Sequence, residues 1–156
     1  MTFETDSKGF SGFFPNTAFE LEEAAKCIAF GRHTASVFHA MRMLELGIKA
    51  ISKRLGIPDP TKAAERNWAF ILKEIKTQID SQWPAQTRMP GTEGAKFDAL
   101  YASLDAAKNP WRNATMHVEN TYALHEALHI LRCSGFFMKQ LMTLADEQGN
   151  DISFLQ

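Results

Sequence analysis

The stretch that decides the fold is residues 37–55, VFHAMRMLELGIKAISKRL. Its apolar positions recur in alternating steps of four and three: Val37, Met41, Leu44, Ile48, Ile51 and Leu55. Because an α-helix has about 3.6 residues per turn, this spacing puts these side chains in one stripe along a rod. Gly56 and Pro58 follow and supply a helix stop. The stretch therefore predicts a long amphipathic helix with one face in a core.

Shorter helices are predicted on both sides of this rod. Thr17-Ala18-Phe19-Glu20 has the pattern of a capping box and predicts a helix from there to about Phe30, with a break at Gly31. Two further apolar stripes follow at helical spacing. They are Trp68, Leu72, Ile75 and Ile79, and then Phe97, Leu100, Leu104 and Ala107, which ends before Pro110.

The last predicted helix, about residues 121–146, carries two adjacent apolar seams. The first is Leu124, Leu128, Leu131, Gly135, Met138 and Met142, and the second is Ala127, Ile130, Ser134, Phe137, Leu141 and Leu144. So wide a face exceeds what a peripheral helix needs. It favours a central helix, or one that also contacts a partner subunit.

These segments predict an all-α fold, an up-and-down bundle of four to five helices. No strand-like alternation of useful length is present, and 156 residues suit one domain. We expect an aromatic arm over residues 1–16, the bundle over residues 17–147 and a tail over residues 148–156.

Composition narrows the class of protein. The chain is 45% hydrophobic and 22% charged, with a formal net charge of −1, as in ordinary globular proteins. Residues 49–76 are basic while both ends are acidic, so we expect any contact with RNA to be local; the alternative is a solvated charged face. Two cysteines without metal-ligand spacing make no disulfide framework. Neither a secretory signal nor an apolar run of ~20 residues is seen, so we expect a cytoplasmic protein without a membrane segment.

The stretch with the clearest chemistry is Trp111-Arg112-Asn113-Ala114-Thr115-Met116-His117. Arginine presents a planar fork of donors that suits phosphate. Histidine is the side chain best suited to proton transfer near neutral pH. Together they can cut a phosphodiester with the RNA 2′-hydroxyl as nucleophile and without a metal.

This arginine, followed by Asn113 and separated from His117 by four residues, resembles the signature of HEPN domains (higher eukaryotes and prokaryotes nucleotide-binding). The order of predicted helices, residues 35–45 (ASVFHAMRMLE) and the tryptophan before the motif are similar to small prokaryotic members as well. The resemblance runs from about residue 17 onward and implies a HEPN-like bundle.

The resemblance also implies a function. Two copies of the bundle would pair so that their motifs face one cleft and cut RNA, leaving a cyclic phosphate, with no metal or other cofactor. Arg112 would bind the phosphate, His117 would transfer a proton and Asn113 would orient the histidine. Such proteins often act as toxins beside a nucleotidyltransferase-type antitoxin. The alternative is a non-catalytic module that binds nucleotides or scaffolds other proteins.

Helical geometry favours a site shared by two copies. In one regular helix Asn113 and His117 lie ~40° apart, but Arg112 and His117 lie ~140° apart and would not converge on one phosphate. Either the segment is irregular near Pro110, or the site is composite across a homodimer. The wide seam of the last helix favours the second. The alternative is a purely structural role, in which Arg112 pairs with a carboxylate, Asp105 or Glu119, and His117 caps a helix end.

Other polar side chains have structural interpretations. His125 and His129 lie one helical turn apart, as in bundle metal sites. Together with Arg132 they fall on the face opposite the apolar seams, so we expect a solvent-facing polar stripe and no metal. His33 and His39 lie off the apolar stripe and should be structural or exposed. Glu45 and Lys49 are spaced for an i, i+4 ion pair; alternatively, a partly buried Glu45 steers Arg112.

Overall fold

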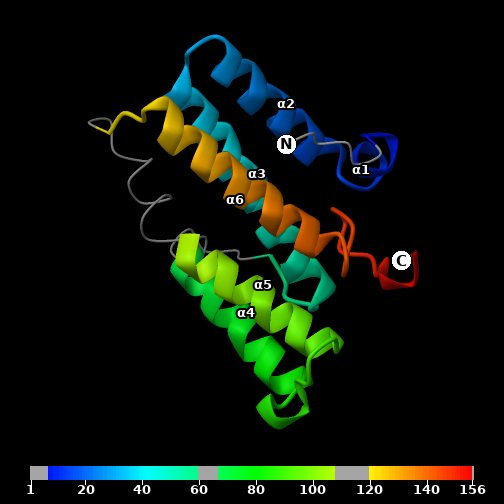
Figure 1. Ribbon diagram of the computed structural model, residues 1–156. Helices are drawn as coiled ribbons and strands as arrows, with labels where there is room; N and C mark the ends of the chain where they lie inside the picture. The colour runs from blue at the N-terminus through cyan, green and yellow to red at the C-terminus, as the bar shows by residue number, and fades with distance from the viewer. Residues whose placement is uncertain (1–6, 60–66, 108–119, 156) are drawn as a thin grey trace.

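The computed structural model describes residues 7–59, 67–107 and 120–155, and within these ranges the chain is helical without a strand (Figure 1). The only β-type pairing there is an isolated antiparallel bridge between Ala145 and Asp151. This confirms the all-α prediction for the described residues. The elements are α1 (Ser7–Phe13), α2 (Pro15–Ala29), α3 (His33–Arg54), α4 (Trp68–Gln82), η2 (Ala85–Thr87), α5 (Glu93–Ala107), α6 (Leu124–Leu141) and η4 (Ser153–Leu155).

Helix α3 is the long amphipathic rod that residues 37–55 predict. Every member of its apolar stripe, from Val37 to Leu55, is buried. The helix ends at Arg54, and Gly56 two residues later has a φ of 74°, which suits the left-handed position after a helix. Gly56 N donates to Lys53 O, and Ile57 N donates to Ser52 O, which completes a Schellman motif.

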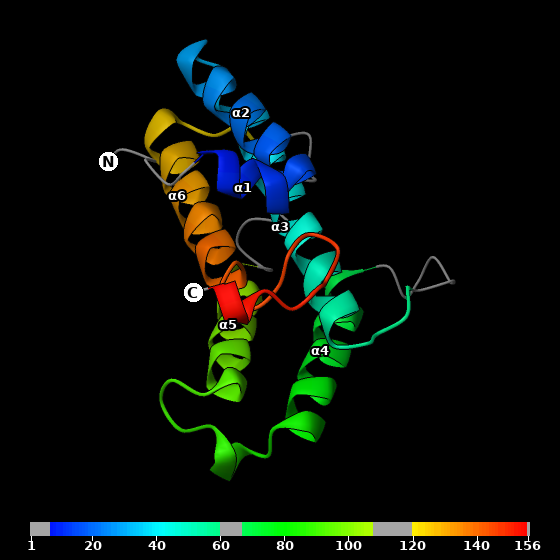
Figure 2. The same cartoon turned by 90° about the vertical axis from the view of Figure 1, so that its right-hand side faces the viewer.

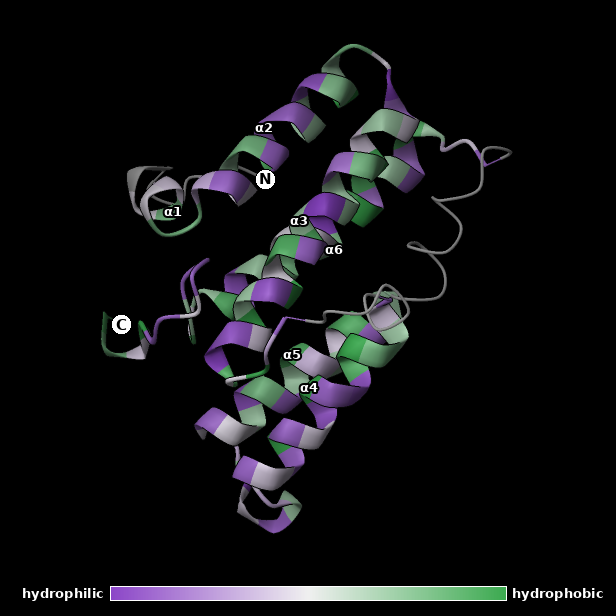
Figure 3. Ribbon diagram, turned by 180° about the vertical axis from the view of Figure 1, so that it is seen from behind, coloured by the Kyte–Doolittle hydropathy of each residue, from purple (hydrophilic) through white to green (hydrophobic). Residues whose placement is uncertain are grey.

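Among the other described helices, α2, α4 and α6 contact α3 (Figures 1 and 2). Helices α2 and α6 both pack against α3. Helices α4 and α5 form an antiparallel hairpin on the side of the molecule where α3 and α6 have their carboxyl ends. Helix α6 packs closely on α3 at Gly47, where the lack of a side chain makes room for Phe137 and Met138. Figure 3 shows hydrophobic and hydrophilic residues alternating along the helices, as amphipathic packing requires.

The stripes predicted for α4 and α5 form the core of the hairpin. Trp68, Leu72, Ile75 and Ile79 on α4, and Phe97, Leu100, Leu104 and Ala107 on α5, are all buried. Trp83 stacks on Phe97 with ring centroids 4.9 Å apart. Arg88 closes the hairpin: its Nη2 pairs with Asp80, its Nη1 with Asp98, and its Nε donates to the carbonyl of Trp83.

The start of α2 differs from the prediction. The helix begins at Pro15 after the N-cap Phe14, which has no side-chain cap bond, so the expected capping box of Thr17 and Glu20 is wrong. A distant carboxylate takes its place: Glu147 accepts from the amide and side chain of Asn16 and from the amide and hydroxyl of Thr17, at 2.7–3.1 Å. This carboxylate accepts hydrogen bonds from N–H groups of the first turn that have no partner within the helix. Its negative charge also interacts favourably with the positive end of the helix dipole.

The segment before α2 also takes part in the core. Residues 7–13 form α1, and Phe14 directly after it is fully buried. Phe10 stacks on Phe14 with ring centroids 5.6 Å apart. Residues 7–13 of the expected aromatic arm thus form a helix, and Phe14 lies inside the core.

Helix α6 is shorter than expected. It begins at Leu124, where the carboxylate of Glu126 accepts from the amide of Ala123, and it ends at Leu141 before a run of turns. The second predicted seam, from Ala127 to Leu144, is buried throughout. The first seam is buried only in part, because Leu124 is 45% exposed and Leu128 is half-buried. No helix in the described ranges has the length and apolar character needed to cross a membrane.

The contact at Gly47 gives a test of the α3–α6 packing. A Cβ added at Gly47 would overlap the Phe137 ring and press on the Met138 sulfur. Gly47→Ala should therefore lower the free energy of unfolding by about 1–3 kcal/mol, despite the better helix propensity of alanine. Chemical denaturation measures this value. The control is Gly12→Ala in α1, where an added Cβ meets nothing within 4 Å; equal losses in the two variants would contradict the described packing.

Candidate functional site

The motif residues Arg112, Asn113 and His117 lie outside the described residues. Glu119, one of the two carboxylates considered as partners of Arg112, lies outside them as well. Their described neighbours fix where this part of the chain begins and ends. Helix α5 ends at Ala107, and the amide of Tyr122 donates to Thr34 Oγ1 at 3.0 Å. The described residues on the two sides of the motif are thus the carboxyl end of α5 and Tyr122, which is bonded to the amino end of α3.

The exposed face of α6 beside that end is polar. His125, His129 and Arg132 are all exposed, which confirms the predicted solvent-facing stripe. Cys133 Sγ lies 3.8 Å from His129 Nε2, but burial raises the pKa of this thiol, so it stays protonated near neutral pH and makes a poor nucleophile. In the described ranges, no three histidine, cysteine or acidic side chains are grouped so that they could hold a metal ion.

The basic stretch of residues 49–76 is partly neutralised by carboxylates. Arg54 pairs with Glu93 and Asp151, and its guanidinium lies over the Phe97 ring. Lys76 lies within 3.1 Å of Asp98 and closer still to Asp80. The hydrogen bond to Asp80 is the main cause of the raised pKa of Lys76. These two cations thus stabilise the fold and are engaged by carboxylates, whereas Lys49 has no ion pair with a described residue.

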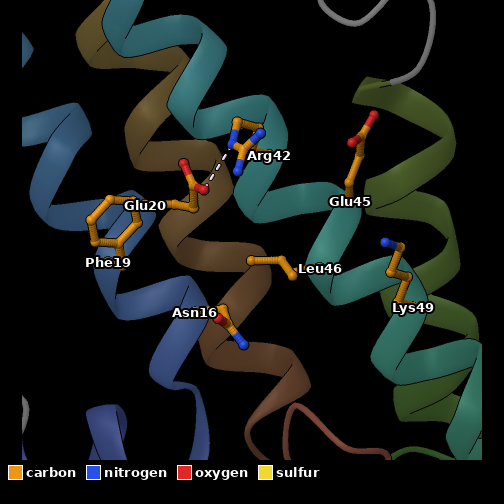
Figure 4. A pocket seen from close by; sticks show the side chains of 7 residues that line it. All are labelled: Asn16, Phe19, Glu20, Arg42, Glu45, Leu46 and Lys49. Carbon is orange, nitrogen blue, oxygen red and sulfur yellow. Dashed lines mark hydrogen bonds and ion pairs between the residues drawn. The ribbon is translucent and has the colours of Figure 1, made fainter.

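A pocket of about 360 Å³ lies between α2 and α3 (Figure 4). Its walls carry one aromatic ring, one aliphatic side chain and several polar or charged groups. The lining residues are Asn16, Phe19, Glu20, Arg42, Glu45, Leu46 and Lys49. We call this pocket the α2–α3 groove. The volume is at the lower end of the range for small-molecule sites.

Glu20 is the buried charge of this groove, with 3% of its surface exposed. Its Oε2 lies 2.7 Å from His39 Nδ1, and its Oε1 accepts from Arg42 Nε at 2.7 Å. A buried carboxylate is costly unless it is paired and hydrogen-bonded, and here both oxygens have a charged or polar partner. The prediction of a structural role for His39 fits this pairing.

Glu45 and Lys49 do not form the expected ion pair among the described contacts. The carboxylate of Glu45 accepts instead from Trp68 Nε1 at 3.4 Å, which is a long hydrogen bond. In Figure 4 it extends along α3 away from Lys49. Glu45 is exposed, which contradicts the idea of a partly buried Glu45; its proposed partner Arg112 is outside the described residues.

Sequence reasoning missed the α2–α3 groove because it assigned Glu20 to a local cap. One signal could have found it: Thr17, Glu20 and Ala24 share one face of α2, and all three are buried. A carboxylate on the buried face of a helix needs a cationic partner on the helix it packs against. Arg42 and His39, on the polar side of the predicted α3 stripe, were the available partners.

Comparison of the chain with models of known protein families, with curated proteins and with solved structures finds no match in any of the three.

The Glu20 pairing gives a test of what holds α2 to α3. Glu20→Gln keeps the shape of the side chain but removes the charge that accepts from Arg42. Because the site is buried and both Arg42 and His39 lose a charged acceptor, the free energy of unfolding should fall by about 1–3 kcal/mol. Thermal or chemical denaturation measures this, with Glu22→Gln on the exposed face of α2 as control. If both variants unfold like the native chain, the pairing contributes nothing to stability.

Proposed function

We propose that this chain is a HEPN-like, metal-independent endoribonuclease of toxin type, which acts on RNA through Arg112, Asn113 and His117 at a homodimer interface. One observation carries the proposal: an arginine, an asparagine and a histidine lie in this spacing in the sequence between α5 and α6, in a chain whose described residues form helices without a strand. Members of the proposed family often act beside a nucleotidyltransferase-type antitoxin, and we propose such a partner here.

The chemistry assigned to the motif needs no metal. The RNA 2′-oxygen attacks the adjacent phosphorus as His117 accepts its proton, and a 2′,3′-cyclic phosphate forms. The bond to the 5′-oxygen breaks, and that oxygen takes a proton from the histidine of the second copy. Arg112 stabilises the negative charge that grows on the phosphoryl oxygens. Asn113 holds the His117 ring in the orientation for transfer.

The homodimer part of the proposal has support from the described end of α6. Leu124 is 45% exposed and Leu128 half-buried, directly after the segment that carries the motif. A second copy that covers this apolar strip would bring the two motif segments together. It would also resolve the ~140° between Arg112 and His117 on a regular helix, because each phosphate could meet an arginine and a histidine from different copies.

His117→Ala should abolish detectable RNA cleavage and leave the fold intact, because positioned acid–base catalysis supplies roughly 10²–10⁴-fold in rate. Arg112→Lys should fail as well, since lysine keeps the charge but loses the bidentate fork. Cleavage of a labelled RNA, with and without a metal chelator, measures both. His125→Ala, on the exposed face of α6, is the control and should cut normally.

Two results would reject the ribonuclease: cleavage that requires a divalent ion, or cleavage that survives His117→Ala. Binding of RNA or nucleotide by the native chain without any cleavage would replace it with the non-catalytic binding or scaffolding module.

The dimer can be tested apart from the chemistry. The native chain should be dimeric by light scattering at micromolar concentration, and Leu124→Glu should shift it to monomer because a charge would enter an apolar contact. A glutamate in the first turn suits the helix dipole, so α6 itself should form. Phe136→Glu, farther along α6 at an exposed position, should leave the dimer unchanged. A monomeric native chain contradicts the proposal.

A further inference from the structure

The α2–α3 groove combines features of a ligand site that lie apart from residues 112–117. Figure 4 shows Phe19 on the α2 side and Arg42, Leu46 and Lys49 along α3. Phe19 is 58% exposed, which leaves most of an aromatic ring without a protein partner. An exposed ring beside exposed cations is a combination that planar anions bind well.

Arg42 is held in a fixed orientation for such a ligand. Its Nε donates to Glu20, which is itself buried and held by His39. The side chain of Arg42 is 65% exposed, and its two outer nitrogens form no hydrogen bond or ion pair with a described residue. These outer N–H groups can bind a carboxylate or phosphate, and the rigid fork reduces the entropy lost on binding.

Charge and size restrict the ligand further. Lys49 lies two turns from Arg42, roughly 10 Å along the helix axis, and adds positive charge at the other end of the groove. Glu45 lies between them in sequence and would repel a second anionic group near the middle. The volume of about 360 Å³ suits a compact molecule with Leu46 beneath its ring.

We propose that the α2–α3 groove binds a small aromatic molecule with a single anionic group, a phosphate or a carboxylate. The ring stacks on Phe19, and the anion takes the outer nitrogens of Arg42. None of these residues belongs to the 112–117 motif, so this site does not depend on the proposed ribonuclease.

The test is a titration of the ¹⁵N-labelled full chain, followed by amide chemical shifts. The probes are adenosine monophosphate and indole-3-acetate, which carry a ring with a phosphate or a carboxylate, and inorganic phosphate and adenosine, which carry one part each. At least one two-part probe should shift amides of residues 16–20 and 42–49 and bind at least about tenfold more tightly than either part. Whichever of the two binds more tightly identifies the anion.

Variants check the assigned contacts. Phe19→Ala should weaken binding of the tighter probe about tenfold, and Lys49→Ala about threefold, because one loses stacking and the other a screened charge. Both side chains are exposed, so these variants keep the fold even if Arg42→Gln, which also strips Glu20 of a partner, does not. Phe30→Ala and Lys73→Ala are matched controls at exposed positions away from the groove.

Three results would overturn the site: no shifts with either two-part probe at millimolar concentration, shifts confined to other residues, or equal weakening in the control variants. His117→Ala should bind the probe normally. If it loses binding, the ligand belongs to the motif and the groove proposal is wrong, whereas loss of RNA cleavage alone leaves the groove proposal standing.

Discussion

The carboxylate of Glu20 is the constraint on which the arrangement of α2 and α3 depends. It comes from α2, is almost fully removed from water, and binds His39 and Arg42 of α3 at 2.7 Å each. Apolar contacts between two helices permit sliding and rotation, but a buried charge with two partners permits little of either. The same pairing fixes the guanidinium that lines the α2–α3 groove. The Glu20 side chain thus fixes both the packing of α2 on α3 and the position of Arg42 in the groove.

The helices that could be predicted are those whose signal is local. The apolar stripes of α3, α4 and α5 each repeat at the helical period, and their members are buried as expected. Gly56 ends α3 for a reason that is also local, since its positive φ suits glycine. The polar stripe of His125, His129 and Arg132 follows from the same periodicity, because the residues opposite a buried seam face water.

What could not be predicted depends on partners far away in the sequence. Thr17 and Glu20 fit the pattern of a capping box, yet each binds a distant residue, Glu147 and Arg42 respectively. The wide seam of α6 gave no sign that its first leucine stays exposed. The α2–α3 groove is lined by residues of two helices, so no single stretch of sequence predicts it. The motif at Arg112 and His117 is a sequence prediction whose geometry lies outside the described residues.

The cap that Glu147 places on α2 has a consequence for the order of folding. Glu147 and Thr17 are 130 positions apart, so the first turn of α2 has no carboxylate partner until residue 147 has left the ribosome. Before then its N–H groups depend on water, and the helix can fray. Closing so long a loop costs entropy that is recovered only when the native contacts form. Helix α2, which is synthesised long before residue 147, therefore becomes stable late in folding.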